Sequence, residues 1–312
     1  MMIDNLMYFD TNVYSTLASI MDLVDVANLR KRLLSKGKRP VPSPVNILEI
    51  LATKNEKFRE DIIIVCQHLC EPEILAEPEA LIIDYIASYA PRPETSHLVL
   101  KNQFGISDLA RTWKDVRADK DRTLLLSRED LQRIEVLKTL HGYFHVYYSR
   151  GKRMPDLLLP EFIGEESINE CIADAARELR KERAPNNRMA ILCENRILMT
   201  LTILCAGLSP FPYAIDSYWT AIGIDRVDER FAYAKKELSF LQDAGPIIGL
   251  GTYMGWQATK GLDRGNFYDC MHFMYLPYVD MFVTDDLSFH DFTKEYPESR
   301  ILDRIVTSDA LP

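Results

Sequence analysis

The chain has 312 residues, of which 47% are hydrophobic and 27% charged, and its formal net charge at pH 7 is −9. This composition excludes a disordered chain, a collagen-like repeat and a coiled coil. The excess of acidic residues also excludes a uniformly basic protein that wraps nucleic acid. It does not exclude a local basic patch on an otherwise acidic surface.

The first fifty residues predict a strand, a long helix, a short strand and a second helix. Met7 to Phe9 is an apolar segment that ends at Asp10, and the apolar residues after it recur at three-to-four spacing as far as Gly37. Arg39 to Val41 is a short extended segment. Ser43, which is followed by a proline, is then expected to be the N-cap of the second helix.

The middle of the chain is predicted to be almost wholly helical, with one polar loop over residues 91–126. Helices are expected at 62–69, at 79–90, from Ser127 onward, at 164–183, at 187–207 and at 226–241. His141 and His145 lie four residues apart among aromatic side chains. We interpret this pair as packing residues rather than as zinc ligands, because the zinc-protease arrangement also needs a glutamate between the two.

The last seventy residues return to a mixed pattern. A helix is expected over 266–276, followed by a strand at Met281 to Thr284 and an extended segment at 300–307 that could form an edge strand. Strands therefore lie at both ends of the chain with helices between them. This order predicts an α/β fold with a parallel-sheet core.

The predicted core is discontinuous in sequence. It combines residues 1–57 with residues 245–312, and the region 58–244 is expected to be helical, partly completing this core and partly forming an insertion. The six cysteines lie in apolar contexts without a Cys-x-x-Cys pair, so we interpret them as reduced core thiols.

The N-terminal segment and the longest apolar stretch both favour a cytoplasmic protein without a membrane partner. The segment MMIDNLMYFD carries acids where a signal peptide carries basic residues. The longest apolar stretch, Ile197 to Leu208, is well short of the roughly 18–20 residues that span a bilayer.

Acidic residues follow both terminal strands and lie on neighbouring helices. Asp10 follows the first strand, Asp285 and Asp286 follow the last, and Glu49 and Asp269 lie on predicted helices. Ligands bind at the carboxyl ends of strands in open α/β sheets, and clustered carboxylates repel one another unless a cation neutralises them. The pattern therefore predicts a site for Mg²⁺ or Mn²⁺, both of which prefer oxygen ligands.

The order of these acids resembles that of the PIN-domain nucleases. Three motifs carry the resemblance: FDTNV at 9–13, SPVNILEI at 43–50 and VTDDLSF at 283–289. The resemblance implies catalytic and metal-ligand roles for Asp10, Glu49, Asp269 and Asp286. It implies polar supporting roles for Asn12 and Thr284, and it leaves the role of Asp285 open.

The resemblance covers about 1–57 and 245–312, and it implies a metal-dependent endoribonuclease that leaves a 5′-phosphate and a 3′-hydroxyl. Single-stranded or structured RNA is the expected substrate. The helical region would select the substrate or bind a protein partner or inhibitor, and an oligomer stays open. His272, which lies nearly one helical turn after Asp269, could face the same site.

Two alternative functions share parts of this pattern. A haloacid-dehalogenase-type phosphatase also begins with a strand and an aspartate, but it needs a second aspartate where this chain has Asn12. It also needs a lysine ahead of the acidic pair, and Lys260 is a poor candidate because a helix intervenes. The other alternative is a catalytically inactive PIN-like binding or scaffold protein.

The densest positive run of the chain spans the end of the first predicted helix and the start of the short extended segment after it, between two elements that carry proposed acids. It contains Arg30, Lys31, Arg32, Lys36, Lys38 and Arg39. Two interpretations stay open: contacts with an RNA phosphate backbone beside the metal site, or a solvated helix end whose basic residues favour the helix dipole.

Overall fold

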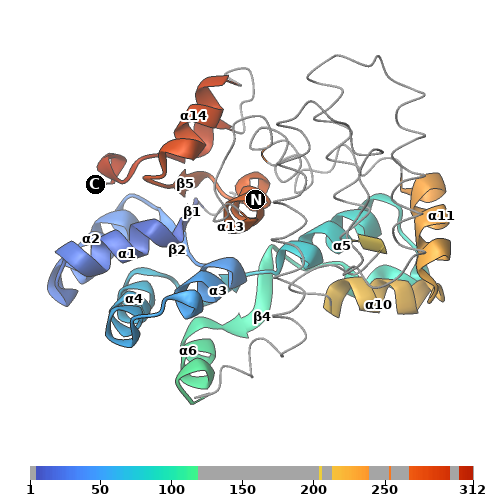
Figure 1. Cartoon of the computed structure of the whole chain (residues 1–312), viewed down its shortest axis with the longest axis horizontal. Coiled ribbons are helices and arrows are strands. Elements are labelled where there is room, and N and C mark those ends of the chain that lie inside the picture. Colours follow the sequence, from blue (N-terminus) through green and yellow to red (C-terminus); the bar gives the residue numbers. More distant parts are fainter. Residues whose placement is uncertain are drawn as a thin grey trace. The chain divides into compact units, whose positions relative to one another are not determined.

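The computed structural model describes residues 5–118, 204–205, 213–238, 253, 267–295 and 302–311 (Figure 1). The chain divides into two compact units, which we describe separately. Unit 1 contains residues 1–77, 101–125 and 275–312, and unit 2 contains residues 78–100 and 126–274. Unit 1 thus combines the two ends of the chain.

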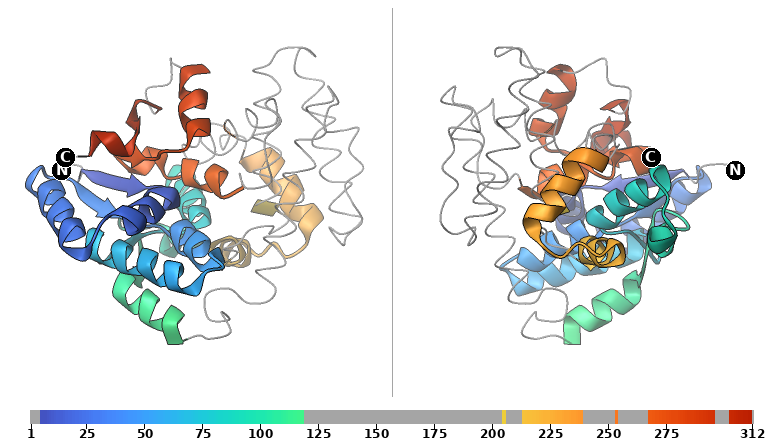
Figure 2. Two further views of the ribbon diagram at one scale, coloured as in Figure 1. Left: turned by 60° about the vertical axis from the view of Figure 1, so that its left-hand side comes forward. Right: turned by 90° about the vertical axis from the view of Figure 1, so that its right-hand side faces the viewer.

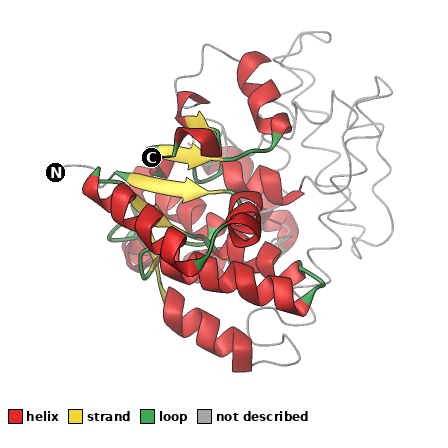
Figure 3. Cartoon of the chain, turned by 90° about the vertical axis from the view of Figure 1, so that its left-hand side faces the viewer, coloured by secondary structure: helices red, strands yellow, loops and turns green. Residues whose placement is uncertain are grey.

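The centre of unit 1 is a parallel sheet of four strands in the order β2-β1-β5-β6 (Figure 3). β1 (Leu6–Phe9) lies between β2 (Arg39–Val41) and β5 (Met281–Val283), and β6 (Ile305–Val306) is the edge strand beside β5. The prediction of an α/β fold with a parallel sheet is therefore confirmed, as is the edge strand expected within 300–307.

Alternate residues of β1 point to opposite faces of the sheet and bury against different layers. Met7 and Phe9 belong to one buried cluster that also contains Val283 of β5. Four helices supply most of the other side chains of this cluster: α1 (Thr11–Ile20), α2 (Leu23–Ser35), α3 (Pro44–Ala52) and α4 (Glu56–Leu69). One face of the sheet is thus covered by helices that follow β1 and β2 in the chain.

Aromatic side chains cover the opposite face of the sheet. Tyr8 stacks on Phe282 of β5, with ring centroids 5.4 Å apart, and contacts Tyr275 at 5.1 Å. Phe282 in turn meets the edge of Phe289 on α14 (Leu287–Glu295), at 5.3 Å. Within unit 1, α14 therefore lies on the opposite side of the strands from α1 and α4 (Figures 1 and 2).

The prediction of one long helix after Asp10 is wrong, because this segment forms two helices, α1 and α2. Asp22 is the N-cap of α2, and its carboxylate accepts hydrogen bonds from the backbone N–H groups of Val24 and Asp25, both at 2.9 Å. Ile20 and Val24, which the single helix would have placed on its apolar face, are 69% and 67% exposed. The N-cap at Asp22, and not the spacing of the apolar residues, therefore sets the boundary between α1 and α2.

Replacing Asp22 should measure the strength of this cap. We expect Asp22→Ala to lower the free energy of unfolding by about 1 kcal/mol, because two backbone N–H groups lose their acceptor. Asp22→Asn keeps an acceptor oxygen at the same place and should be nearly neutral. Urea unfolding of both variants checks this, and equal losses in the two would contradict the capping role.

The described part of the predicted polar loop at 91–126 contains regular structure, so that prediction is wrong there. β4 (Phe104–Asp108) pairs antiparallel with β3 (Glu73–Leu75), and α6 (Leu109–Ala118) follows it. Gly105 lets β4 approach β3 closely, since a Cβ at this position would lie 3.4 Å from the backbone oxygen of Leu75. Leu109 and Trp113, four residues apart, are both buried, so apolar residues at helical spacing were present in this segment and were missed.

Helices make up all the regular structure in the described part of unit 2. Its elements are α5 (Pro78–Tyr89), the 3₁₀ helix η1 (Pro93–Leu98), α10 (Tyr213–Ile222), α11 (Val227–Glu237) and α13 (Phe267–Phe273). Trp219 of α10 is fully buried and donates from its indole N–H to the backbone oxygen of Leu204 at 2.6 Å. The helix predicted at 79–90 is confirmed with a shift of one residue, those predicted at 226–241 and 266–276 are confirmed with shorter bounds, and α10 was not predicted.

Several predictions fall on residues outside the described part of the chain. These are the helices from Ser127 and at 164–183, nearly all of the helix at 187–207, the pair His141 and His145, and two of the six cysteines. Among the described residues, no helix is both long enough and apolar enough to cross a membrane.

Candidate functional site

Two parallel strands of unit 1 end side by side and place polar residues at one edge of the sheet. Phe9 of β1 is in register with Val283 of β5. The backbone N–H of Asp10 donates to the backbone oxygen of Val283 at 2.9 Å. The segments of β1 and β5 therefore stay hydrogen-bonded one residue beyond the end of β1. Asp10 and Thr284, which directly follow the two strands, therefore lie next to each other.

Thr284 holds the carboxylate of Asp10. Its hydroxyl donates to Oδ2 of Asp10 at 2.7 Å, and the same hydroxyl oxygen accepts the backbone N–H of Asp286 at 3.1 Å. The Thr284 hydroxyl thus accepts one hydrogen bond, from the N–H of Asp286, and its single proton is donated to the carboxylate of Asp10. Asp10 is only 5% exposed, and Thr284 is fully buried.

Glu49 brings a second carboxylate to the same edge from α3. One of its carboxylate oxygens lies within 4.8 Å of a carboxylate oxygen of Asp10. The hydroxyl of Thr11 donates to Oε2 of Glu49, so a threonine also holds this acid. Two carboxylates at this separation repel when both are ionised, and a proton or a cation between them relieves the repulsion.

The start of α3 explains why Glu49 reaches this edge. Ser43 is the N-cap of α3 as predicted, and it forms a capping box with Asn46. The Nδ2 atom of Asn46 donates to the backbone oxygen of Phe9 at 3.0 Å and to the hydroxyl oxygen of Thr11 at 3.1 Å. These contacts attach the first turn of α3 to the carboxyl end of β1.

Sequence reasoning missed the roles of Thr11 and Asn46. Both residues enter the sequence analysis only as part of a motif, Thr11 in FDTNV and Asn46 in SPVNILEI. One signal was present, because an amide three residues after a serine N-cap completes a capping box. That signal identifies the cap, whereas the contact with β1 depends on the fold.

Tyr8 extends the polar contacts into the interior of unit 1. Its hydroxyl lies 2.7 Å from the hydroxyl oxygen of Ser43, and both residues are fully buried. Burial raises the pKa of Tyr8 well above its ordinary value, and the nearby Tyr275 and the charges of Glu49 and Asp10 raise it further. Tyr8 is therefore a neutral phenol that can donate a hydrogen bond.

The other predicted acids have separate surroundings. Oδ1 of Asp286 accepts the backbone N–H of Ser288 at 2.7 Å at the start of α14, and the exposed Asp285 accepts the backbone N–H of Ser308 at 2.8 Å. Both acids thus stabilise local backbone beside the site. Asp269 lies on α13, in unit 2, and its role as a metal ligand stays a prediction, as does that of His272 on the same helix.

The donor atoms of the site are those that hard divalent cations prefer. Asp10 and Glu49 supply carboxylate oxygens. Asn12 has a buried amide oxygen, Oδ1, that lacks a hydrogen-bond partner among the residues described. Mg²⁺ and Mn²⁺ bind carboxylate oxygens, so Asp10 and Glu49 fit either ion, and the supporting role of Asn12 stays a prediction.

Arg39, the last residue of the basic run, lies at the other end of β1 from Asp10. Arg39 is in register with Leu6, at the start of β1, whereas Asp10 follows the end of β1. Four residues of extended chain correspond to roughly 13 Å. The register of Arg39 therefore favours the second of the two interpretations, in which the basic run is a solvated helix end.

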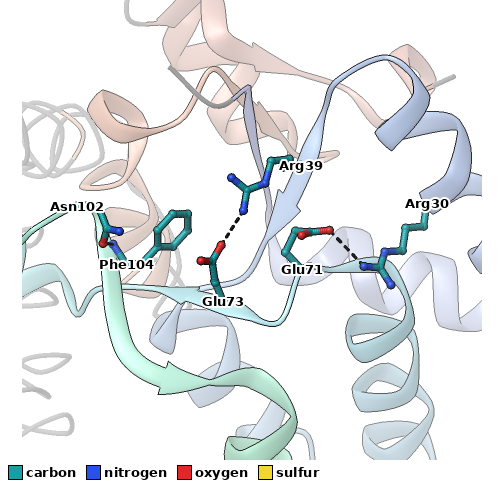
Figure 4. A network of polar contacts seen from close by, with 6 residues as sticks. All are labelled: Arg30, Arg39, Glu71, Glu73, Asn102 and Phe104. Carbon is teal, nitrogen blue, oxygen red and sulfur yellow. Dashed lines mark hydrogen bonds and ion pairs between the residues drawn. The ribbon is translucent and has the colours of Figure 1, made fainter. Parts of the chain in front are cut away.

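Two arginines of this run form ion pairs with the chain that leads into β3 (Figure 4). Arg30 contacts Glu71 at 3.2 Å and Arg39 contacts Glu73 at 2.6 Å. The guanidinium of Arg39 also lies over the ring of Phe104, 5.9 Å from its centroid. Contact of the six basic residues with RNA stays a prediction, for Arg30, Lys31, Arg32, Lys36, Lys38 and Arg39 alike.

The described cysteines offer no reactive thiol. Cys66, Cys70, Cys205 and Cys270 are all buried. Hydrogen bonding with Cys70, followed by burial, raises the pKa of Cys66, and burial raises the pKa of Cys270. Thiols with raised pKa values are poor nucleophiles, which agrees with their interpretation as core residues.

Comparison of the chain with protein-family models, with curated proteins and with solved structures found no match. The function of the site must therefore be argued from its own residues.

Proposed function

We propose that unit 1 is the PIN-like core of a metal-dependent ribonuclease and that Asp10 and Glu49 hold its Mg²⁺ or Mn²⁺. One observation carries the proposal: two carboxylate oxygens lie within 4.8 Å of each other at the carboxyl edge of a parallel sheet. This is the edge at which α/β proteins bind ligands. Placing two acids there is costly without a counter-charge, and a divalent cation supplies it.

The proposed reaction is hydrolysis of a phosphodiester. A water oxygen forms a bond to phosphorus, the bond from phosphorus to the 3′ oxygen breaks, and that oxygen leaves with a proton. Bound at the two acids, Mg²⁺ or Mn²⁺ would supply positive charge for the phosphate oxygens and lower the pKa of the attacking water.

Two threonines contribute to the proposed reaction by fixing the carboxylates of Asp10 and Glu49. Thr284 donates to Asp10, and Thr11 donates to Glu49, so each carboxylate keeps one oxygen in a fixed hydrogen bond. Asp286 supports Thr284 through its backbone N–H, and it is a further ligand in our proposal.

The choice of RNA as the substrate rests on the resemblance of the three acidic motifs to PIN-domain nucleases. A pair of acids with a divalent cation suits any phosphodiester, so the pair by itself does not select RNA over DNA. A direct comparison of single-stranded RNA with single-stranded DNA of the same sequence tests the choice, with product ends identified as 5′-phosphate and 3′-hydroxyl.

Binding of Mn²⁺ should stabilise the folded chain. A ligand that binds only the folded state at ten times its Kd raises the free energy of unfolding by about 1.4 kcal/mol. We expect MnCl₂ to raise the Tm of the wild type and to have little effect on Glu49→Gln, because this variant loses one of the two charged ligands. Thermal unfolding with and without MnCl₂ measures the difference.

A matched control separates this effect from a general loss of negative charge. Glu94 is exposed and lies in unit 2, so Glu94→Gln should keep the full response to MnCl₂. A wild-type Tm that does not change with millimolar MnCl₂ would overturn the proposed cation site and favour a scaffold function.

A further inference from the structure

We propose that Thr11 is the positioning residue for Glu49 and that Asn46 sets the direction of the Thr11 hydroxyl proton. This inference rests on the cation site proposed above and extends it to two residues without charge. Thr11 follows Asp10 at the start of α1, and Asn46 lies one turn before Glu49 on α3. They connect the two helices that carry the acids.

The orientation of the Asn46 amide is fixed by backbone groups. Oδ1 accepts the backbone N–H of Ser43 at 2.9 Å, and an N–H group can only donate. Nδ2 faces the backbone oxygen of Phe9 at 3.0 Å, and a carbonyl oxygen can only accept. An exchanged oxygen and nitrogen would break both contacts, so the amide has one allowed orientation.

This orientation determines the hydrogen bond of Thr11. The second hydrogen on Nδ2 of Asn46 points at the hydroxyl oxygen of Thr11, which lies 3.1 Å away and must accept it. The only proton of the Thr11 hydroxyl is then left for Oε2 of Glu49. Glu49 therefore receives a hydrogen bond whose direction is set by Asn46.

The chain of hydrogen bonds begins further inside unit 1. The hydroxyl of Ser43 donates to Oδ1 of Asn46 at 3.3 Å, so Tyr8 is the donor in its 2.7 Å contact with Ser43. All donors in this chain point toward Glu49. Hydrogen bonds aligned in one direction polarise one another, which strengthens the last of them.

Thr284 and Thr11 each donate a hydrogen bond to a carboxylate of the site, but different groups orient their hydroxyls. The Thr284 hydroxyl is oriented by a backbone N–H, that of Asp286, which only a substitution by proline removes. The Thr11 hydroxyl is oriented by a side chain, so its direction can be changed by mutation. Glu49 is half-buried, and this hydrogen bond contributes to fixing its carboxylate beside Asp10.

Loss of the Thr11 hydroxyl should therefore weaken cation binding without unfolding the protein. In Thr11→Val, Nδ2 of Asn46 keeps its hydrogen bond to Phe9, and the new methyl group has the size of the hydroxyl. Removal of residues that orient metal ligands typically weakens metal binding by about 10–100-fold. Thr11→Ser keeps the hydroxyl and is the matched control.

Calorimetric titration of the full chain with MnCl₂ tests the role of Thr11. We expect the Kd of Thr11→Val to be about tenfold higher than that of the wild type, and that of Thr11→Ser to be within about twofold. Equal Kd values for the valine variant and the wild type would overturn the role of Thr11 while the cation site stands. A wild type that does not bind Mn²⁺ would overturn both proposals.

A double-mutant cycle tests whether Asn46 acts through Thr11. Asn46→Ala should weaken Mn²⁺ binding in the wild type but change it by less than about twofold in the Thr11→Val background. Full additivity of the two losses would overturn the role of Asn46. Because Asn46→Ala also leaves buried backbone groups without partners, titrations are run in the cold, and circular dichroism checks that each variant is folded.

Discussion

Asp10→Asn should remain folded and lose Mn²⁺-dependent cleavage of single-stranded RNA by about 10³-fold, since the cation supplies several kcal/mol of transition-state stabilisation. Asparagine has nearly the shape of aspartate, and its oxygen can still accept the hydroxyl of Thr284, which now lies 2.7 Å from Oδ2 of Asp10. The variant loses the charge beside Glu49. Initial rates on an end-labelled RNA with MnCl₂ measure the loss, and the Tm without metal checks the fold.

Asp309→Asn is the control for the change of charge. Asp309 is exposed and lies near the C-terminal end of unit 1, so this variant should cleave RNA at the wild-type rate. Wild-type cleavage by Asp10→Asn would contradict the proposed mechanism. A wild type that binds Mn²⁺ through Asp10 but cleaves neither RNA nor DNA would favour the inactive scaffold.

The strands and the start of α3 could be predicted because their signals are local. Met7 to Phe9 and Met281 to Val283 are short apolar segments followed by aspartate or threonine, and both form strands. Ser43 with the proline after it is a helix start that needs no distant contact, and the structure has it. Because both strands are parallel and paired, the position of Asp10 beside Thr284 follows from the same pattern.

The support of Glu49 could not be predicted, because it depends on contacts between distant residues. Nothing in the sequence places Asn46 against the backbone of Phe9, 37 positions earlier. The location of Arg39 is a similar case. Its proximity to the acids in sequence left open whether it lies beside them, but the register of β2 with β1 places it at the opposite end of the strands.

The packing of β5 against β1 should be the most sensitive structural feature of the site. Phe282 is fully buried between Tyr8 and Phe289, with ring centroids 5.4 and 5.3 Å away. We expect Phe282→Ala to lower the free energy of unfolding by about 3–5 kcal/mol, because it removes both contacts and leaves a cavity. Denaturant unfolding, with the midpoint and slope fitted separately, measures this loss.

The size of this loss depends on burial, and a neighbouring residue provides the comparison. Leu287 is 77% exposed at the start of α14, so Leu287→Ala should change the free energy of unfolding by no more than about 0.5 kcal/mol. Similar losses for both variants would contradict the packing of Phe282 between the two aromatic rings. A large loss for Phe282→Ala alone would mean that these rings hold β5 against β1, two residues before Thr284 contacts Asp10.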